Sequence, residues 1–254
     1  MSTQANEETS WGQVAAWYDE VVEDKESYQQ QVILPHLTRI LALTKNDHLL
    51  DVACGTGFFA HSFAKQGANV TGVDVAPELV ALAKRHAGPR EQFVVGRADQ
   101  LPLSDQSATK ATCILALQNI QNLEGTLFEC QRALAASGTL HLVLNHPAFR
   151  VPRGSSWGFD NKEGRQYRRI DHYLTESRVE INMHPGGRAT ETTLSFHRPL
   201  QVYMKALRKC GFAVTALEEW ISHKKSEPGP HAKTENNARK EIPLFLYLEA
   251  GKLS

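Results

Sequence analysis

Strand-like and helix-like segments alternate through the middle of the chain. Short runs rich in β-branched residues lie at 48–53, 69–74, 92–98, 109–117 and 138–145. Helical patterns lie between them at 57–66, 77–87 and 123–136. Strands that alternate with helices of this length form βαβ units, whose strands run parallel in one sheet. The sequence therefore predicts an α/β fold built on a parallel sheet.

The pattern changes on both sides of this core. Helical spacing of apolar residues predicts helices over 11–22 and 27–43, with Pro35 starting a new helix or kinking the run. From 147 the chain is long, irregular and rich in Gly and aromatic residues, as lids and binding loops often are. After it we expect a strand at 190–196, a helix from Pro199 to Gly211, a strand at 212–220, a polar loop over 222–242 and a strand at 242–250.

The composition narrows the class of protein. Lys plus Arg number 28 and so do Asp plus Glu, and this zero balance disfavours a protein that binds nucleic acid through its phosphates. The chain has no apolar stretch of about 20 residues, and its polar first residues lack the layout of a secretory signal. Its four cysteines lack paired spacing, so we expect a reduced, cytoplasmic protein without a metal site or a membrane partner.

Polar and glycine residues follow four of the expected strands. Asp51 and the turn Gly55-Thr56-Gly57 come after the first strand, and Asp74 ends the second. The third and fourth strands are followed by two polar pairs, which are Asp99 with Gln100 and Gln118 with Asn119. In an open parallel sheet, ligands bind beyond the carboxyl ends of the strands. These residues therefore predict one binding site at that edge of the sheet.

The charge of Asp51 indicates which ligand the glycine turn holds. Gly55, Gly57 and Ala60 match the dinucleotide pattern G-x-G-x-x-G/A, and Asp74 stands where a ribose-binding acid belongs. A pyrophosphate at the turn would, however, lie beside the Asp51 carboxylate, and like charges a few ångström apart repel. An ammonium group would be attracted instead. A ligand with a ribose, an adenine and an amino-acid end meets every demand, and S-adenosylmethionine is such a ligand.

Three stretches carry a resemblance to a known family. The motif D-x-x-C-G-x-G from Asp51 to Gly57, followed by "VTGVDVAPELVALAKRHA", resembles class I S-adenosylmethionine-dependent methyltransferases. The ubiquinone/menaquinone-biosynthesis-type and small-molecule branch is the most similar. "GRADQLPLSDQSATKATCILALQNI" and "HRPLQVYMKALRKCGFAVTALEEW" fit the same pattern, so the likeness covers roughly 45–145 and 190–250. It implies a Rossmann-like, seven-stranded, mostly parallel sheet with helices on both faces and an antiparallel last strand, "IPLFLYLEA".

The resemblance also implies an organisation. It places all of 1–254 in a single methyltransferase domain. Its parts are a helical amino-terminal cover (1–44), a cofactor-binding core (45–145), a lid or substrate insertion (146–190) and a carboxy-terminal part of the sheet (190–254).

A set of cofactor contacts follows from the same resemblance. Asp74 would accept both ribose hydroxyls, Val75 would pack on the adenine face, and Asp99 with Gln100 would read the adenine amino edge. As alternatives, Asp74 caps the following helix and Asp99 is an ordinary turn residue. Tyr18, on the covering helices, contacts the cofactor or only packs. The full implied set is Tyr18, Asp51, Ala53, Gly55, Thr56, Gly57, Asp74, Val75, Asp99, Gln100 and the backbone near Leu117.

The residues that meet the methyl acceptor are less constrained. His146, just past the fifth strand, is a candidate general base, with orientation of the following turn as the alternative. Gln118 and Asn119 orient a polar acceptor or satisfy backbone groups. Trp157 and Tyr173 suit a wall for a flat substrate, unless the insertion buries its own aromatic residues. Three further residues of the insertion would suit an anionic acceptor, namely Arg165, Arg168 and Arg169.

These observations predict methyl transfer from S-adenosylmethionine to a small organic acceptor. Three alternatives stay open. They are methylation of RNA or protein, NAD-dependent oxidoreduction, which Asp51 disfavours, and binding of the cofactor without catalysis. The acceptor, the methylated atom and the oligomeric state are not determined by the sequence.

Overall fold

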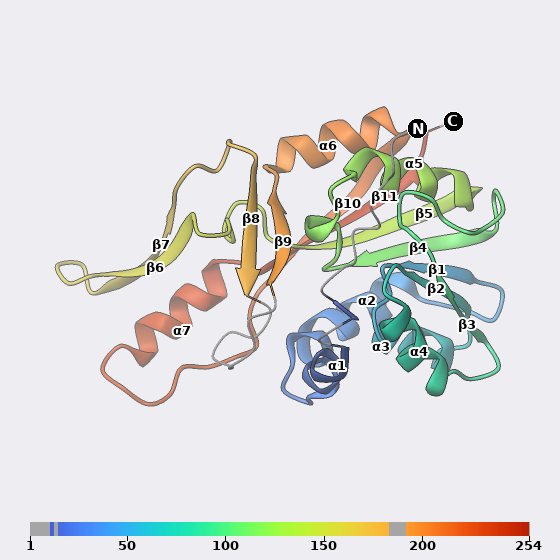
Figure 1. Ribbon diagram of the computed structural model, residues 1–254. Helices are drawn as coiled ribbons and strands as arrows, with labels where there is room; N and C mark the ends of the chain where they lie inside the picture. The colour runs from blue at the N-terminus through green and yellow to red at the C-terminus, as the bar shows by residue number, and fades with distance from the viewer. Residues whose placement is uncertain (1–10, 13–14, 183–191, 254) are drawn as a thin grey trace.

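A single sheet of seven strands organises the molecule (Figure 1). The computed structural model describes residues 11–12, 15–182 and 192–253, and its sheet has the order β10-β11-β5-β4-β1-β2-β3. Neighbours from β5 to β3 pair in parallel, whereas β11 is antiparallel to both β5 and β10. The predicted Rossmann-like sheet with an antiparallel last strand is confirmed. The strands are β1 His48–Val52, β2 Asn69–Asp74, β3 Glu91–Val95, β4 Ala108–Ile114, β5 Leu134–Asn145, β10 Phe212–Trp220 and β11 Phe245–Lys252.

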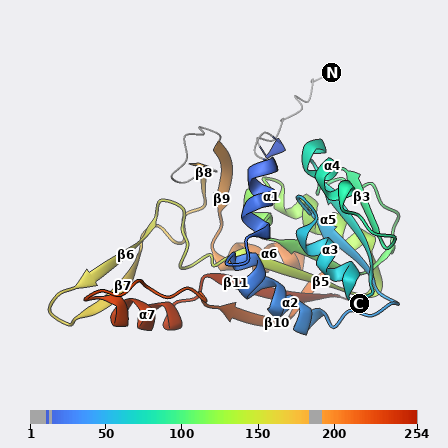
Figure 2. The same ribbon diagram turned by 90° about the horizontal axis from the view of Figure 1, so that it is seen from below.

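Helices cover both faces of this sheet, as predicted (Figures 1 and 2). One face buries the apolar sides of α2 (Leu34–Leu41), α3 (Phe58–Lys65) and α4 (Pro77–Arg85), and the other buries those of α5 (Leu123–Ala133) and α6 (Leu200–Lys209). A π-helical turn, Gln29–Ile33, leads into α2, which begins at Leu34 with Pro35 in its first turn. Proline is tolerated there because the first N–H groups of a helix have no partner within it. Helix α1 (Ala15–Glu23) contacts α3 and α4.

Two β-hairpins follow β5. Three of their four strands lie in the segment from 147 that was expected to be irregular, which corrects the prediction, whereas the fourth was expected at 190–196 and is confirmed over its described residues. Strands β6 (Ser155–Asp160) and β7 (Arg165–Ile170) form one, and β8 (Ser177–Asn182) and β9 (Thr192–His197) form the other. Every residue of β6, β7 and β8 is exposed or half-buried, so these strands lack the apolar alternation that marks a strand in a sequence. Figure 2 shows the β6/β7 hairpin projecting away from the sheet.

The expected polar loop over 222–242 is also wrong in part. Residues Ala232–Glu241 form helix α7, which lies against β7 (Figure 1). Ala238 is its one buried residue, so the helix carries almost no apolar stripe for a sequence pattern to reveal. None of the helices in the described part of the chain combines the length and the apolarity that crossing a bilayer requires.

Candidate functional site

The backbone after β1 makes a tight left-handed turn. The φ angles of Ala53, Gly55 and Gly57 are 57°, 58° and 84°. Glycine adopts such angles without steric cost, whereas the angle at Ala53 is strained and persists only where the surrounding structure holds it. A Cβ atom at Gly57 would lie 2.9 Å from His61 Nε2 and 3.0 Å from the Phe93 ring. The sequence thus places bare backbone where a ligand can approach closely.

Two buried carboxylates lie beside this turn. Asp51 is 2% exposed and accepts a hydrogen bond of 2.8 Å from Thr112 Oγ1, because Thr112 stands opposite it on β4. Asp74 accepts from the backbone N–H groups of Gly55 and Ala76, both at 2.9 Å. Burial is the main cause that raises the pKa of Asp51 to about 7; the hydrogen bond from Thr112 opposes this rise, and the charge of Asp74 adds to it. Burial also raises the pKa of Asp74.

Neither carboxylate has a cationic partner. Within the part of the chain that the structure describes, no Lys, Arg or His side chain pairs with Asp51 or Asp74. Buried carboxylates are costly when unpaired, so this pair attracts a ligand that carries positive charge. Thr56, which is 4% exposed, has a buried hydroxyl without a partner in the same turn. The residues present therefore fit a cationic ligand with polar groups.

Asp74 does not act as the cap of the next helix. Ala76 is the N-cap residue of α4, and no side chain caps that helix. The two Asp74 oxygens instead tie the glycine turn to the end of β2, and each keeps a second lone pair for a ligand hydroxyl. Val75 follows with 39% of its surface exposed, as an apolar wall open to a ligand would be. Its contact with adenine stays a prediction.

Asp99 lies in a network of its own. Arg97 donates to its two oxygens at 2.9 and 3.0 Å, and Asn122 Nδ2 donates at 2.9 Å. These bonds hold the pKa of Asp99 below its usual range, with the Arg97 guanidinium as the main cause. Gln100 is exposed. The predicted contact of Asp99 and Gln100 with the adenine amino group therefore stays a prediction.

The loop after β4 is held by Arg198, a residue that lies much further along the chain. Leu115 has a φ of 53°, and the turn Leu117–Asn119 follows. Gln118 Nε2 donates to the Leu115 carbonyl, which leaves the buried Gln118 Oε1 without a partner. Asn119 is half-buried. Arg198, 7% exposed, donates to the carbonyl oxygens of this loop at 2.8–3.2 Å; they belong to Leu117, Ile120 and Gln121.

His146 is engaged at both ring nitrogens. Its Nδ1 accepts from the Ala148 N–H at 3.2 Å, so Nε2 carries the proton and donates to Glu219 at 2.7 Å. Burial lowers the pKa of His146, and the hydrogen bond to Glu219 opposes that effect. These contacts are those of a histidine that orients the turn after β5. Its role as a general base stays a prediction.

The predicted residues of the insertion lie on separate elements. Trp157 on β6 is 39% exposed, with the Arg168 guanidinium 5.2 Å from its ring centroid. The Tyr173 hydroxyl accepts from the Leu200 N–H at 3.0 Å, at the start of α6. Arg169 pairs with Asp171 at 2.8 Å, and Arg165 is exposed. Tyr18 lies in α1, but its side chain is outside the described part of the chain.

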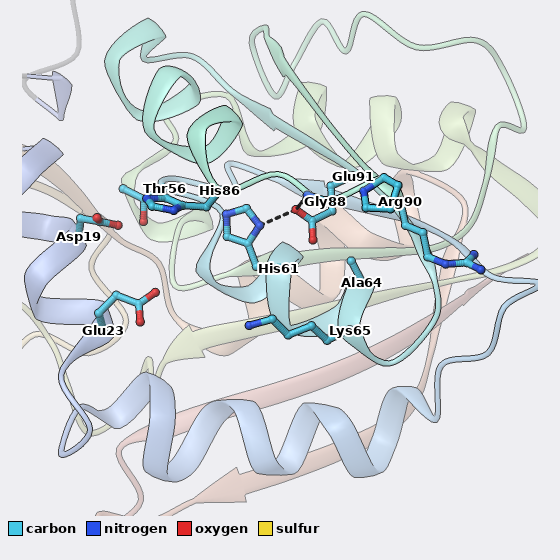
Figure 3. Close-up of a pocket in the computed structure, with 11 residues that line it drawn as sticks. Asp19, Glu23, Thr56, His61, Ala64, Lys65, His86, Gly88, Arg90 and Glu91 are labelled. Atoms are coloured by element: carbon cyan, nitrogen blue, oxygen red, sulfur yellow. Dashed lines mark hydrogen bonds and ion pairs between the residues drawn. The ribbon is translucent and has the colours of Figure 1, made fainter.

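A cavity of about 660 Å³ opens between α1, α3 and the loop before β3 (Figure 3). His61 Nδ1 lies 2.6 Å from Glu91 Oε2, whereas its buried Nε2 has no partner. Asp19 and Glu23 of α1 line the cavity from the other side. Thr56 is the residue that this cavity shares with the glycine turn. Sequence reasoning did not single out His61, because its contacts with β3 have no local signature.

Sequence comparisons place the core of the chain in a known family. Residues 50–142 match a family profile described as a methyltransferase domain. A demethylmenaquinone methyltransferase of Tropheryma whipplei is 31% identical over 112 residues, 43% of this chain and 46% of that protein. A ubiquinone biosynthesis O-methyltransferase of Coxiella burnetii is 29% identical over 99 residues, 38% of this chain and 42% of that protein. The matched segments thus span less than half the length of these relatives.

Similarity in structure extends further along the chain than similarity in sequence. An S-adenosylmethionine-dependent methyltransferase of Mesorhizobium loti superposes with a TM-score of 0.69 at 25% identity. The superposition covers 86% of this chain and 96% of that one. The similarity in structure therefore extends beyond residues 50–142, which match the family profile.

Proposed function

We propose that the chain is a class I S-adenosylmethionine-dependent methyltransferase that transfers a methyl group from S-adenosylmethionine to a small organic acceptor; the profile match of its core and its fold support this proposal. The observation that carries this proposal is the pair of buried carboxylates, Asp51 and Asp74, beside a strained glycine turn and without a cationic partner. A phosphate-bearing dinucleotide would add negative charge there, whereas a ligand with an ammonium and a sulfonium would relieve the repulsion.

Each residue then has a defined task. When bound, S-adenosylmethionine supplies an electrophilic methyl group. Asp51 attracts the ammonium end, and Thr56 Oγ1 offers a polar contact in the same turn. The second lone pairs of the two Asp74 oxygens match a cis-diol. Holding the ligand in this way aligns the methyl group and excludes water, which is most of what a direct displacement asks of the protein.

The acceptor site lies on the other half of the sheet edge. The loop after β4 and the insertion after β5 follow the neighbouring carboxyl ends, with Gln118 at the start of this region. The relatives named above include methyltransferases of quinone biosynthesis, and this supports a small molecule as acceptor. The zero net charge supports it over RNA.

Calorimetric titration of S-adenosylhomocysteine, with NADH in parallel, tests the proposal. We expect micromolar binding of S-adenosylhomocysteine alone, weakened at least tenfold by Asp51→Ala. Asp105→Ala serves as the control, because that carboxylate is 74% exposed and pairs with Arg132 far from the turn. Binding of NADH would show that the turn holds a phosphate. Equal affinity for S-adenosylhomocysteine in Asp51→Ala and wild type would show that the charge argument about Asp51 is wrong.

A further inference from the structure

Two arginines stand close together just beyond β5. Arg168 of β7 donates from Nε to the Phe149 carbonyl at 2.9 Å and from Nη2 to Ser155 Oγ at 2.7 Å. The same guanidinium lies over the Trp157 ring. The bond to Phe149 holds Arg168 against the segment of chain that contains Arg150, the residue that follows Phe149. Loss of solvent lowers the pKa of Arg168, and the neighbouring charge of Arg150 lowers it further.

This arginine pair lacks a counter-charge. Within the described residues, the Arg150 guanidinium makes no hydrogen bond or ion pair, and no carboxylate pairs with Arg168. Burial among protein atoms lowers the pKa of Arg150, although its side chain is exposed. Carboxylate partners are present at Arg39, Arg97, Arg132 and Arg169.

Arg150 lines a small cavity of about 30 Å³ together with Gln118, Ser195 and Tyr203. Gln118 is 9% exposed, and its Oε1 is buried without a partner. Its amide nitrogen donates to a carbonyl, which can only accept, so Oε1 is fixed as an acceptor. Arg198 also lines the cavity, but its guanidinium already donates to three loop carbonyls. The cavity has room for one small polar group, and among the described residues it is lined by the Arg150 cation and by Gln118 Oε1, an acceptor without a partner.

We infer that the methyl acceptor is a carboxylic acid that also carries a hydroxyl or amine: its carboxylate binds Arg150 and Arg168, and its O–H or N–H donates to Gln118 Oε1. This inference rests on the proposed function. Guanidinium groups bind carboxylates through paired, charge-assisted hydrogen bonds. The two anchors lie near the ends of β5 and β4, so they hold an acceptor of small size across the mouth of the sheet edge.

The test uses the complex of the protein with S-adenosylhomocysteine. A panel of aromatic and aliphatic hydroxy acids and amino acids, each paired with its neutral amide, is titrated into that complex by calorimetry. We expect at least one acid to bind tenfold or more tightly than its amide, and Arg150→Gln to abolish the preference. Arg169→Gln is the matched control, because that neighbouring arginine already pairs with Asp171.

The possible outcomes distinguish the proposed function from the inference that the acceptor is a carboxylic acid. Failure of S-adenosylhomocysteine to bind overturns the proposed function itself. If it binds but no acid in the panel binds, or the amides bind as tightly as the acids, the anionic acceptor is overturned and the methyltransferase assignment stands. Because the Arg150 side chain makes no contact that the fold needs, Arg150→Gln should keep wild-type affinity for S-adenosylhomocysteine. A loss of that affinity would show that Arg150 serves the cofactor instead.

Discussion

The carboxyl ends of the parallel strands form one edge of the sheet, and the two halves of this edge carry opposite charge. The half at β1 and β2 presents Asp51 and Asp74, two buried carboxylates without a cation. The half beyond β5 presents Arg150 and Arg168, two guanidiniums without a carboxylate. Each half is destabilised by its own charges and would be relieved by a ligand of the other sign. The comparison teaches that unpaired charge among the described residues, more than cavity shape, supports the two proposed binding sites.

Removing charge from the first half should have the largest effect. Asp74→Asn is expected to weaken S-adenosylhomocysteine binding by about 2–4 kcal/mol, because charge-assisted hydrogen bonds to the ligand are lost. Calorimetry measures the change, and circular dichroism checks that the fold is kept. Glu78→Gln, an exposed acid in the first turn of α4, is the control. Equal affinities in Asp74→Asn and wild type would remove Asp74 from the site.

The cost of burying the Asp51 charge should also be measurable in the free energy of unfolding. The folded-state pKa of Asp51 is raised from 3.8 to about 7, so stability from this group is present at low pH and is lost as pH rises through about 7. Asp51→Asn should therefore unfold at higher urea than wild type at about pH 8. The difference in free energy of unfolding should be about 2 kcal/mol smaller at about pH 5.5.

The control for this measurement is the exposed carboxylate of Asp105. Asp105→Asn should show no pH-dependent gain. If Asp51→Asn raised the free energy of unfolding equally at both pH values, the charge of Asp51 would not destabilise the fold. The contrast between the two halves would then rest on the arginines alone.

The smallest effect on stability is expected from a substitution in the β6/β7 hairpin. Trp157 is 39% exposed beneath Arg168, and a cation–π contact at such a site contributes about 0.5–1 kcal/mol. Trp157→Ala should lower the free energy of unfolding by no more than that and leave S-adenosylhomocysteine affinity unchanged. Urea unfolding and calorimetry measure the two quantities. Weaker cofactor binding in Trp157→Ala would show that the halves are not independent.

The first half was predictable from sequence because its information is local. Asp51 and Gly57 belong to one turn, and Asp74 ends the next strand, so a short pattern carries all three. The sheet itself was predictable because buried strands and half-buried helices leave different periodicities. Their alternation indicates that the strands run parallel in one sheet.

The second half was not predictable, because its contacts join distant segments. Arg198 bonds to the loop after β4 from more than seventy residues away in the chain. Arg150 is distinguished only by having no carboxylate partner among the described residues. The exposed hairpins and α7, with Ala238 as its one buried residue, bury too little apolar surface to leave a pattern. Of the three arginines expected to meet an anion, Arg169 is already paired.

The insertion after β5 is held to the sheet at both of its ends. At its start, His146 donates a hydrogen bond to Glu219 of β10. At its end, Arg198 donates to the carbonyl oxygens of the loop after β4. Between these anchors, the described strands pair within each hairpin and not with the sheet. We therefore expect that the length and side chains of this insertion can change while the glycine turn and the strand ends of the sheet keep their geometry.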